Sequence, residues 1–359
     1  MDFMLTFKPK GSYLTIEDQS VAEILQKASE NRPLTKDDLL ILMECNPVSP
    51  EAGAVRLFAD IMTRKAFGNA GEVHAQIGLN IATCSKGCRF CSFGHPVKRV
   101  ELTLAEILQR VRTFQNEGAN AIFLMVTADY NFRRFLTIGE AVRKILDPTM
   151  PLVANVGDFD SSQAQELVDS GFTAIYHVVR LREGVDTKIE PSTRLATIRA
   201  AQSVGLDLSY CVEPIGPEHT NEELVDSMLL ARELKPSVMA TMRRIAVPGV
   251  ELSKFGQISE IELAKIEAVT RIAIGNEIRA MGVHEANSHS LTAGANQIYA
   301  ETGPNPRDTI EDTSKGRGLS AERCTQMLME AGLKPRVKGA ASLQGLLRRL
   351  LEKEIMPLT

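Results

Sequence analysis

The spacing of apolar residues changes character near residue 73. Before that point, apolar positions recur at helical spacing in the stretches that begin at Val21, Leu39 and Glu51. Thr15 and Thr35 precede the first two stretches and are followed by acidic residues, the pattern of a helix N-cap and first turn. The first 70 residues therefore predict a set of helices that precede the main core.

From residue 73 onward, short β-prone runs alternate with amphipathic stretches, the pattern of a parallel sheet built from βαβ units. We count eight such runs. They are Val73 to Ile81, Ala121 to Val126, Leu152 to Val156, Ala174 to Val179, Leu206 to Val212, Val238 to Ile245, Ala280 to Ala286, and Gln297 to Glu301.

Helical stretches separate most of these runs, beginning at Leu104, Ile138, Ser161, Thr193, Glu222 and Glu260. Eight units predict an α/β fold, a closed (βα)8 TIM-type barrel with N-terminal helices and a C-terminal helical tail. We expect helices over 1–70, the barrel over 71–303 and the tail over 304–359. Such barrels place their chemistry at the carboxyl ends of the strands.

Composition excludes several classes of protein. Of the 359 residues, 44% are hydrophobic and 24% charged, which is ordinary for a globular protein. A net charge of -4 predicts no general affinity for nucleic acid or for an anionic membrane. No apolar run is long enough to span a bilayer, and the residues from Met1 to Phe7 lack a secretion-signal pattern. We expect a cytoplasmic protein.

Half of the six cysteines lie within eight residues directly after the first strand: Cys84, Cys88 and Cys91. In a reducing compartment this favours a metal site over a disulfide framework. Three thiolates at this spacing suit an iron–sulfur cubane with one iron left open, whereas an electron-transfer cluster normally takes four cysteines. Zinc is the alternative, because His95 would complete a Cys3His site. Apolar Phe90 and Phe93 beside the thiolates favour the redox cluster.

The C-x3-C-x2-C loop, with Phe90 just before its last cysteine, resembles the signature of the radical S-adenosylmethionine (SAM) enzymes. The resemblance implies that Cys84, Cys88 and Cys91 hold a [4Fe-4S] cluster. It further implies that SAM chelates the open iron and is cleaved to a 5′-deoxyadenosyl radical.

The eight-unit barrel, the preceding helices and the tail motifs near Gly303 and Ala331 resemble the branch that contains biotin synthase, the hydrogenase maturase HydE and methylornithine synthase. In biotin synthase a second cluster is bound by cysteines of the second, third and fifth strands. Here the second and third runs have no cysteine and only Cys211 lies near the fifth. The resemblance therefore excludes biotin synthase itself.

The same resemblance implies contacts to SAM. After the second strand, relatives carry a glycine-rich turn with a glutamate for the SAM amino group; here Thr127 and Ala128 replace the usual Gly and Glu, which leaves backbone carbonyls and Asp129 as the candidate contacts. After the fourth strand, relatives carry an Arg with a Glu, which here are Arg180 or Arg182 with Glu183. Glu213, at the end of the fifth strand, is placed to face the cavity. Read without the family, Asp129 is equally well an N-capping acid in a turn, and the charged group after the fourth strand a surface salt-bridge cluster.

Polar residues at the ends of later strands are candidate substrate contacts. On the sixth run, alternation places Thr241 and Arg243 on one face, and an arginine in the mouth would suit an anion. The seventh run contains His284 and Glu285 near its end and is followed by His289, and together these form a dense polar cluster. Singly each would be a satisfied core or loop group; together at a strand end they predict catalytic contacts.

These observations predict a radical SAM enzyme that abstracts hydrogen from a small anionic substrate, in rearrangement or cofactor-maturation chemistry. The expected partners are that small molecule and a reductant such as ferredoxin or flavodoxin, with no nucleic acid and no membrane. Two alternatives stay open. One is sulfur insertion of lipoyl or biotin type with an auxiliary cluster that uses Cys45, Cys211 or Cys324. The other is a non-catalytic zinc or iron–sulfur scaffold.

Overall fold

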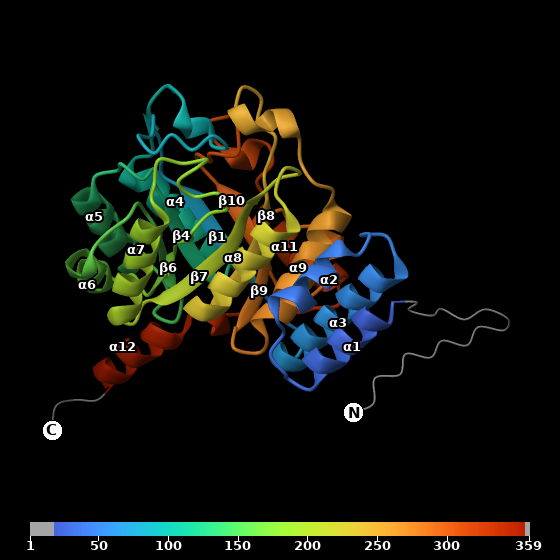
Figure 1. The fold of residues 1–359 in the computed structure, drawn as a ribbon. Coiled ribbons are helices and arrows are strands. Elements are labelled where there is room, and N and C mark those ends of the chain that lie inside the picture. The colour runs from blue at the N-terminus through green and yellow to red at the C-terminus, as the bar shows by residue number, and fades with distance from the viewer. Residues whose placement is uncertain (1–17, 356–359) are drawn as a thin grey trace.

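The computed structural model describes residues 18–355 and confirms the predicted barrel (Figure 1). Eight parallel strands pair in the order β10-β9-β8-β7-β6-β5-β4-β1, and β10 pairs with β1 to close the ring. Their bounds are β1 Ala70–Gly78, β4 Ala121–Met125, β5 Leu152–Asn155, β6 Ala174–Tyr176, β7 Asp207–Ile215, β8 Val238–Arg243, β9 Ala280–Val283 and β10 Gln297–Thr302.

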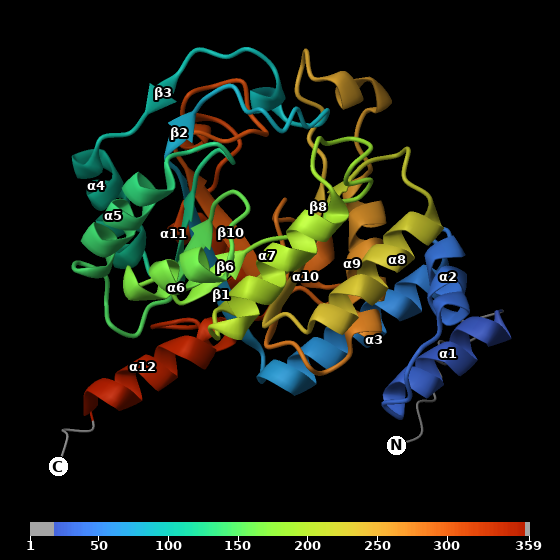
Figure 2. The same cartoon turned by 60° about the vertical axis from the view of Figure 1, so that its left-hand side comes forward.

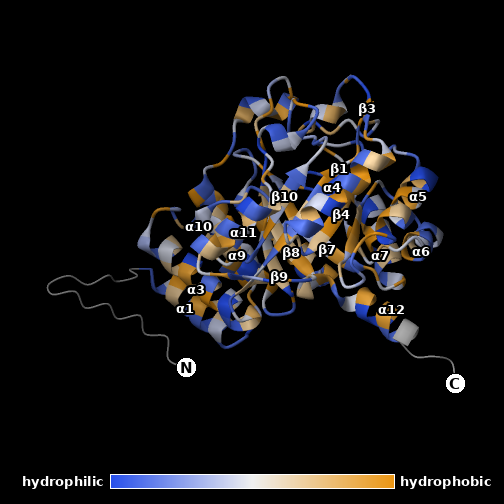
Figure 3. Ribbon diagram, turned by 180° about the vertical axis from the view of Figure 1, so that it is seen from behind, coloured by the Kyte–Doolittle hydropathy of each residue, from blue (hydrophilic) through white to orange (hydrophobic). Residues whose placement is uncertain are grey.

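The outer ring consists of the predicted amphipathic helices. These are α4 Leu104–Asn116, α5 Phe132–Arg143, α6 Ser161–Asp169, α7 Pro191–Ser203, α8 Asn221–Leu234 and α9 Glu260–Ile274, with the short α10 Ser288–Leu291 after β9. Capping boxes start α4 and α8, because Thr103 pairs with Glu106 and Thr220 with Glu223. Figure 3 shows hydrophobic residues concentrated along the strands and on the helix faces that turn towards them.

Three N-terminal helices precede the barrel: α1 Gln19–Ser29, α2 Lys36–Glu44 and α3 Pro50–Phe67. They lie against one side of it, since α3 packs on α9, and α2 on α8 and α9. The buried Lys265 of α9 donates from Nζ to the carbonyls of Met43 and Cys45 at 2.8 and 3.1 Å, which satisfies the end of α2. The expected cap at Thr35 is present, whereas Thr15 lies outside the described residues.

The tail closes the amino end of the barrel. After the loop with the short helix η3 Thr313–Lys315 it forms α11 Ala321–Glu330, β11 Lys334–Pro335, η4 Ala341–Leu343 and α12 Gly345–Ile355. Strand β11 pairs with Ala70 and Gly71 at the start of β1. The buried Glu72 carboxylate binds Arg336 at 3.0 Å and accepts from the Ser342 backbone at 3.2 Å. Figure 2 shows α12 at the end opposite the long strand-end loops, which leaves the carboxyl end for a site.

Within residues 18–355, no helix is both long and apolar enough to cross a membrane. The residues on which the expectation of no secretion signal rests lie outside this range. The division into segments at 70/71 and 303/304 stays a prediction.

Gly78, the last residue of β1, has the least room for a side chain among the described glycines. A Cβ on it would lie 1.6 Å from the carbonyl oxygen of Pro304, so either β1 or the loop after β10 must move. We expect Gly78→Ala to lose at least about 2 kcal/mol of unfolding free energy, as overpacking does, and to lower the melting temperature by several degrees.

Gly53 provides the matched control. It lies within α3, and its nearest neighbour to a new Cβ is an Arg56 nitrogen at 4.0 Å. Gly53→Ala should therefore be neutral or stabilise by up to about 1 kcal/mol through helix propensity. Equal melting temperatures for the two variants in thermal unfolding would contradict the steric account of Gly78.

Candidate functional site

The cysteine loop is pinned at its base by a small hairpin. After β1, strand β2 Asn80–Ile81 pairs antiparallel with β3 Val100–Glu101, so the intervening residues project as one loop above the barrel. Inside the loop the Cys84 backbone donates to the Phe93 carbonyl at 2.8 Å, next to the short helix η1 Ser92–Gly94. The loop thus folds back on itself and gathers its three cysteines.

Four strand-end loops hold the cysteine loop from outside. The first two contacts, to the loop after β6, are Arg89 N to the Asp186 carbonyl and Lys188 N to the Lys86 carbonyl, each 2.9 Å. From the loop after β8, Leu252 N donates to the Arg89 carbonyl at 3.1 Å. Ser92 N donates to the carbonyl of Pro306, in the loop after β10, at 3.1 Å. Ser85 Oγ donates to Asp129, in the loop after β4, at 2.8 Å. Most of these are backbone contacts and fix the loop independently of side-chain rotamers.

The three thiols lie along one wall of a cavity, with Phe90 and Phe93 beside them. Burial, with a smaller effect from the neighbouring Cys88 and Cys84, raises the pKa of Cys91 to about 12. Burial also raises the pKa of Cys88. Ligation of either thiol by a metal must therefore displace its proton.

The geometry gives the zinc alternative no support. Across residues 18–355, no three Cys, His, Asp or Glu side chains converge tightly enough to hold a single ion, and His95 is exposed. A cubane needs no such convergence, because each cysteine binds a different iron. The arrangement therefore fits a cluster better than one tetrahedral zinc.

The next part of the wall comes from β6 and β7. Arg180 lies in the cavity, and its Nε is 3.1 Å from the Glu213 carboxylate, which also accepts from the Tyr176 hydroxyl. Burial alone would lower the pKa of Arg180, but Glu213 and Glu183 raise it. The Arg180 charge in turn lowers the pKa of Cys88, against the larger effect of burial. A guanidinium thus lies near one of the three cysteines of the loop.

The structure separates the other predicted SAM contacts from the cavity lining. Arg182 turns outward, with Nε 2.6 Å from Glu223, so of the two arginines only Arg180 reaches the cavity. Glu183 is buried behind it and accepts from the Arg180 backbone at 3.0 Å. Asp129 binds Ser85 of the cysteine loop. Glu183 and Asp129 are thus placed to position other groups.

The expected placement of Arg243 in the mouth needs correction. Thr241 and Arg243 do share a face of β8, but Thr241 donates to Glu267 of α9, and Arg243 reaches the Ile258 carbonyl at 3.2 Å and Glu260 at 3.4 Å. That face is the outer one. Strand alternation then turns Met242 inward, and it is the following Arg244 that lines the cavity.

Of the polar cluster after β9, His284 alone reaches the cavity. It is 5% exposed, stacks on Tyr299 with ring centroids 3.6 Å apart, and neither ring nitrogen has a hydrogen-bond partner among the described residues. Burial and then Arg307 lower its pKa well below the usual range, so the ring is neutral. His289 is exposed on α10.

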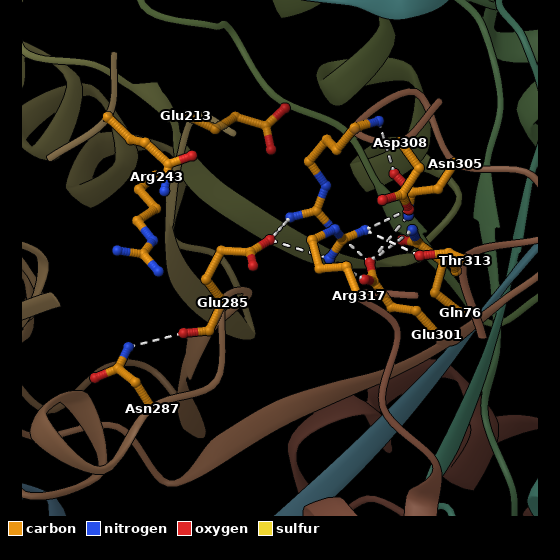
Figure 4. Close-up of polar contacts among 12 residues, drawn as sticks. Gln76, Glu213, Arg243, Glu285, Asn287, Glu301, Asn305, Asp308, Thr313 and Arg317 are labelled. Carbon is orange, nitrogen blue, oxygen red and sulfur yellow. Dashed lines mark hydrogen bonds and ion pairs between the residues drawn. The ribbon is translucent and has the colours of Figure 1, made fainter. Parts of the chain in front are cut away.

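Glu285 belongs instead to a buried network that the tail loop completes (Figure 4). Arg307 binds Glu285 at 2.5 Å and also Glu301, while Arg317 binds Glu285 at 3.1 Å and Glu301 at 2.5 Å. Burial alone would raise the pKa of Glu301, but the two arginines lower it to about 2. Arg307 also lines the cavity, so the network positions a guanidinium there.

Sequence reasoning missed several cavity residues. Arg244 directly follows Arg243, the residue that the sequence predicted. The contact of Thr241 with α9 shows which face of β8 is the outer one, and the sequence alone does not give that contact. Arg307 lies just after Pro306 in the tail, where no strand pattern points to the mouth. Arg194 comes from α7 and binds Asp158 at 3.0 Å. Gln76 and Asn155 sit inside otherwise buried strands.

Comparison with known families places the chain in one class. Residues 81–260 match the model described as the radical SAM superfamily, so the chain belongs to that superfamily. The match begins three residues before Cys84 and includes Arg180, Glu213 and Arg244.

Individual relatives narrow the class further. Biotin synthase of Desulforudis audaxviator is 27% identical over 77% of this chain and 86% of that protein. Among solved structures, the [FeFe]-hydrogenase maturase HydG matches with a TM-score of 0.77 at 15% identity, over 94% of this chain and 81% of that one. Methylornithine synthase (PylB) matches with a TM-score of 0.76 at 18% identity, over 87% of this chain and 97% of that one. The chain is thus similar to biotin synthase at low identity, and it shares its fold with HydG and methylornithine synthase.

The protein is accordingly an enzyme whose superfamily uses a [4Fe-4S] cluster and SAM, acts on small molecules and needs a reductant. The residues present fit both groups. Cys84, Cys88 and Cys91 would hold the cluster, and the same cavity offers the Arg180–Glu213 pair, a guanidinium and a carboxylate as a zwitterion requires.

Replacing any one cluster cysteine should remove the cluster. We expect Cys84→Ala, Cys88→Ala and Cys91→Ala each to lose the visible iron–sulfur absorption and SAM cleavage after anaerobic reconstitution, because thiolates are the only protein ligands proposed. His95→Ala is the control and should keep both, since that side chain is exposed. Loss of metal in the histidine variant would support zinc.

Proposed function

We propose that this enzyme cleaves SAM reductively and abstracts hydrogen from a small anionic substrate, in rearrangement or cofactor-maturation chemistry. The observation that carries the proposal is that one cavity is lined by the three cysteines, His284 and Arg307. When bound, the cluster and SAM supply the radical that abstracts hydrogen.

The chain's own residues divide this cavity. Arg180 and Glu213 stand beside the cysteines and are our candidates for the carboxylate and ammonium of SAM. Thr127 and Ala128 also line this side, and the Asn80 side chain holds Thr127 through bonds of 2.9 and 3.0 Å. This side would orient SAM towards the cluster.

The lining residues from β8, β9 and the tail loop are our candidates for the substrate. His284 offers an unpartnered donor and an unpartnered acceptor, and Met242 provides an apolar surface. The charged groups that line the cavity are mostly cations. There is one carboxylate, Glu213, against five cations: Lys86, Arg180, Arg194, Arg244 and Arg307. This excess of donors at the surface supports an anionic group on the substrate.

No structural observation favours sulfur insertion with a second cluster. Cys211 lies inside the barrel, with Sγ 3.6 Å from the Val212 carbonyl. Cys324 lies on α11, with Sγ 3.5 Å from the Tyr299 carbonyl. Cys45 lies at the end of α2, outside the barrel. We propose a single cubane, and therefore about four irons per reconstituted chain. Reproducibly higher iron that is lost on changing Cys211 or Cys324 would overturn this choice.

The proposed setting is a reducing cytoplasm with a ferredoxin or flavodoxin as electron donor. All six cysteines are free, as reducing conditions require. The direct test of the function is anaerobic reconstitution with iron, sulfide, dithionite and SAM, followed by chromatography for 5′-deoxyadenosine. Its absence from a protein with a full cluster would overturn the proposal and favour a non-catalytic scaffold.

Arg180→Ala should weaken SAM binding, because it removes one partner of a buried charged contact, a loss of about 2 to 5 kcal/mol. Arg182→Ala is the matched control, two residues away and directed to Glu223, and should bind SAM normally. Glu183→Gln should have an intermediate effect, since Glu183 acts through the Arg180 backbone. Equilibrium dialysis with labelled SAM measures all three. Equal losses for Arg180→Ala and Arg182→Ala would contradict the assignment.

His284→Gln should impair the response to substrate without impairing SAM cleavage. We expect uncoupled 5′-deoxyadenosine formation within about twofold of wild type, with stimulation by substrate reduced at least tenfold, roughly the loss of one good hydrogen bond. Arg243→Ala and His289→Ala, which lie outside the cavity lining, should retain the stimulation. Stimulation can be assayed with a small-molecule extract before the substrate is known. Loss of uncoupled turnover in His284→Gln would move this residue to the SAM side.

A further inference from the structure

We propose that the outer surface of the cysteine loop is the docking surface for the electron donor. We call it the donor face and define it by residues 86–89, 185–188 and 251–255. The proposal rests on the proposed function, because only an enzyme that cleaves SAM reductively needs an electron at this place. The occupant to which we commit is a small acidic one-electron carrier protein.

Arg89 joins the three segments into one surface. Its guanidinium binds Asp186 and Glu251, each at 2.6 Å, and its carbonyl accepts from Leu252 N. The last segment is the short helix η2 Glu251–Phe255. Figure 2 shows the cysteine loop, the loop after β6 and η2 at the same end of the barrel.

The donor face is one residue layer from the cluster ligands. Gly87, between Cys84 and Cys88, has a φ of +54°, and a Cβ on it would meet the Lys188 side chain at 3.1 Å. Lys188 is exposed and therefore lies directly over the loop that would hold the cluster. A carrier bound here comes close to the cluster without entering the substrate cavity.

The charge of the donor face is opposite to that of the whole chain. The chain carries a net charge of -4, whereas the donor face has four cations, Lys86, Arg89, Lys188 and Lys254, against the carboxylates of Asp186 and Glu251. Both carboxylates are already bound to Arg89, and no described residue forms an ion pair with the exposed Lys188 or Lys254, whereas Lys86 lines the cavity. This excess of positive charge favours an acidic partner and speeds its approach.

Two apolar side chains supply contact area beside these lysines. Val185 is 70% exposed and Phe255 is 45% exposed, and the Lys254 ammonium lies 5.1 Å from the Phe255 ring. Exposed apolar groups rimmed by charge are typical of protein contacts, and redox encounters use small interfaces. The combination fits a transient electron-transfer complex.

The test compares two reductants on the same protein. The variant is Val185→Asp with Lys254→Glu, neither of which lines the cavity or contacts a cysteine. With flavodoxin reduced by its NADPH-dependent reductase, we expect the KM for flavodoxin in 5′-deoxyadenosine formation to rise at least tenfold. With dithionite, which needs no docking, the rate should equal wild type. Lys334→Glu is the matched control, an exposed lysine on β11 at the opposite end of the barrel, and should leave both rates unchanged.

Ionic strength adds a second readout. The flavodoxin KM of wild type should rise between about 0.05 and 0.3 M salt, because screening shortens the range of surface charges, and the variant should respond less. If the variant keeps the wild-type KM for flavodoxin and is active with dithionite, the proposed docking surface is wrong, but the proposed function still stands. A change in the variant's sedimentation would instead make this face a contact between copies of the chain and also overturn the proposal. No 5′-deoxyadenosine from wild type with dithionite would overturn the proposed function itself.

Discussion

The constraint on which the site depends is the fastening of the cysteine loop to four other loops. Contacts to Asp129, Asp186, Leu252 and Pro306 come from the ends of β4, β6, β8 and β10. Each can form only when the barrel is closed and those strand ends stand at one level. The local sequence supplies three cysteines, but the barrel as a whole determines where they point. The orientation of the three cysteines therefore depends on the folded barrel.

A second constraint is the way charges are buried. Every arginine on the cavity wall is paired with a carboxylate: Glu213 for Arg180, Asp158 for Arg194, Glu218 for Arg244, and Glu285 with Glu301 for Arg307. An unpaired guanidinium at this depth would lose several kcal/mol of solvation. The carboxylates offset that cost and fix each side chain, while remaining N–H groups face the cavity. The wall is thus rich in donors without a large net charge.

How far sequence reasoning reached follows from the range of each interaction. Strands and helices were predictable because their patterns are local, and the cysteine loop because its ligands lie within eight residues. The sequence placed Arg243 in the mouth because strand alternation defines two faces without showing which one is the inner face. The contact of Thr241 with α9 shows that the face of Thr241 and Arg243 is the outer one. Arg307 was not predictable, because its partners Glu285 and Glu301 come from two other parts of the chain.

The extent of the superfamily match bears on specificity. It ends at residue 260, so it covers the cysteines, Arg180 and Glu213 but stops before β9, β10 and the tail loop. His284, Glu285, Glu301, Arg307 and Arg317 all lie beyond it. The residues proposed for SAM thus lie within the matched segment, whereas the other cavity residues are divided, with Met242 and Arg244 inside it and His284 and Arg307 beyond it. Because Arg307 is held by Glu285 and Glu301, and the preceding Pro306 accepts from Ser92 of the cysteine loop, a change in the tail loop would affect the substrate contact and the cysteine loop together.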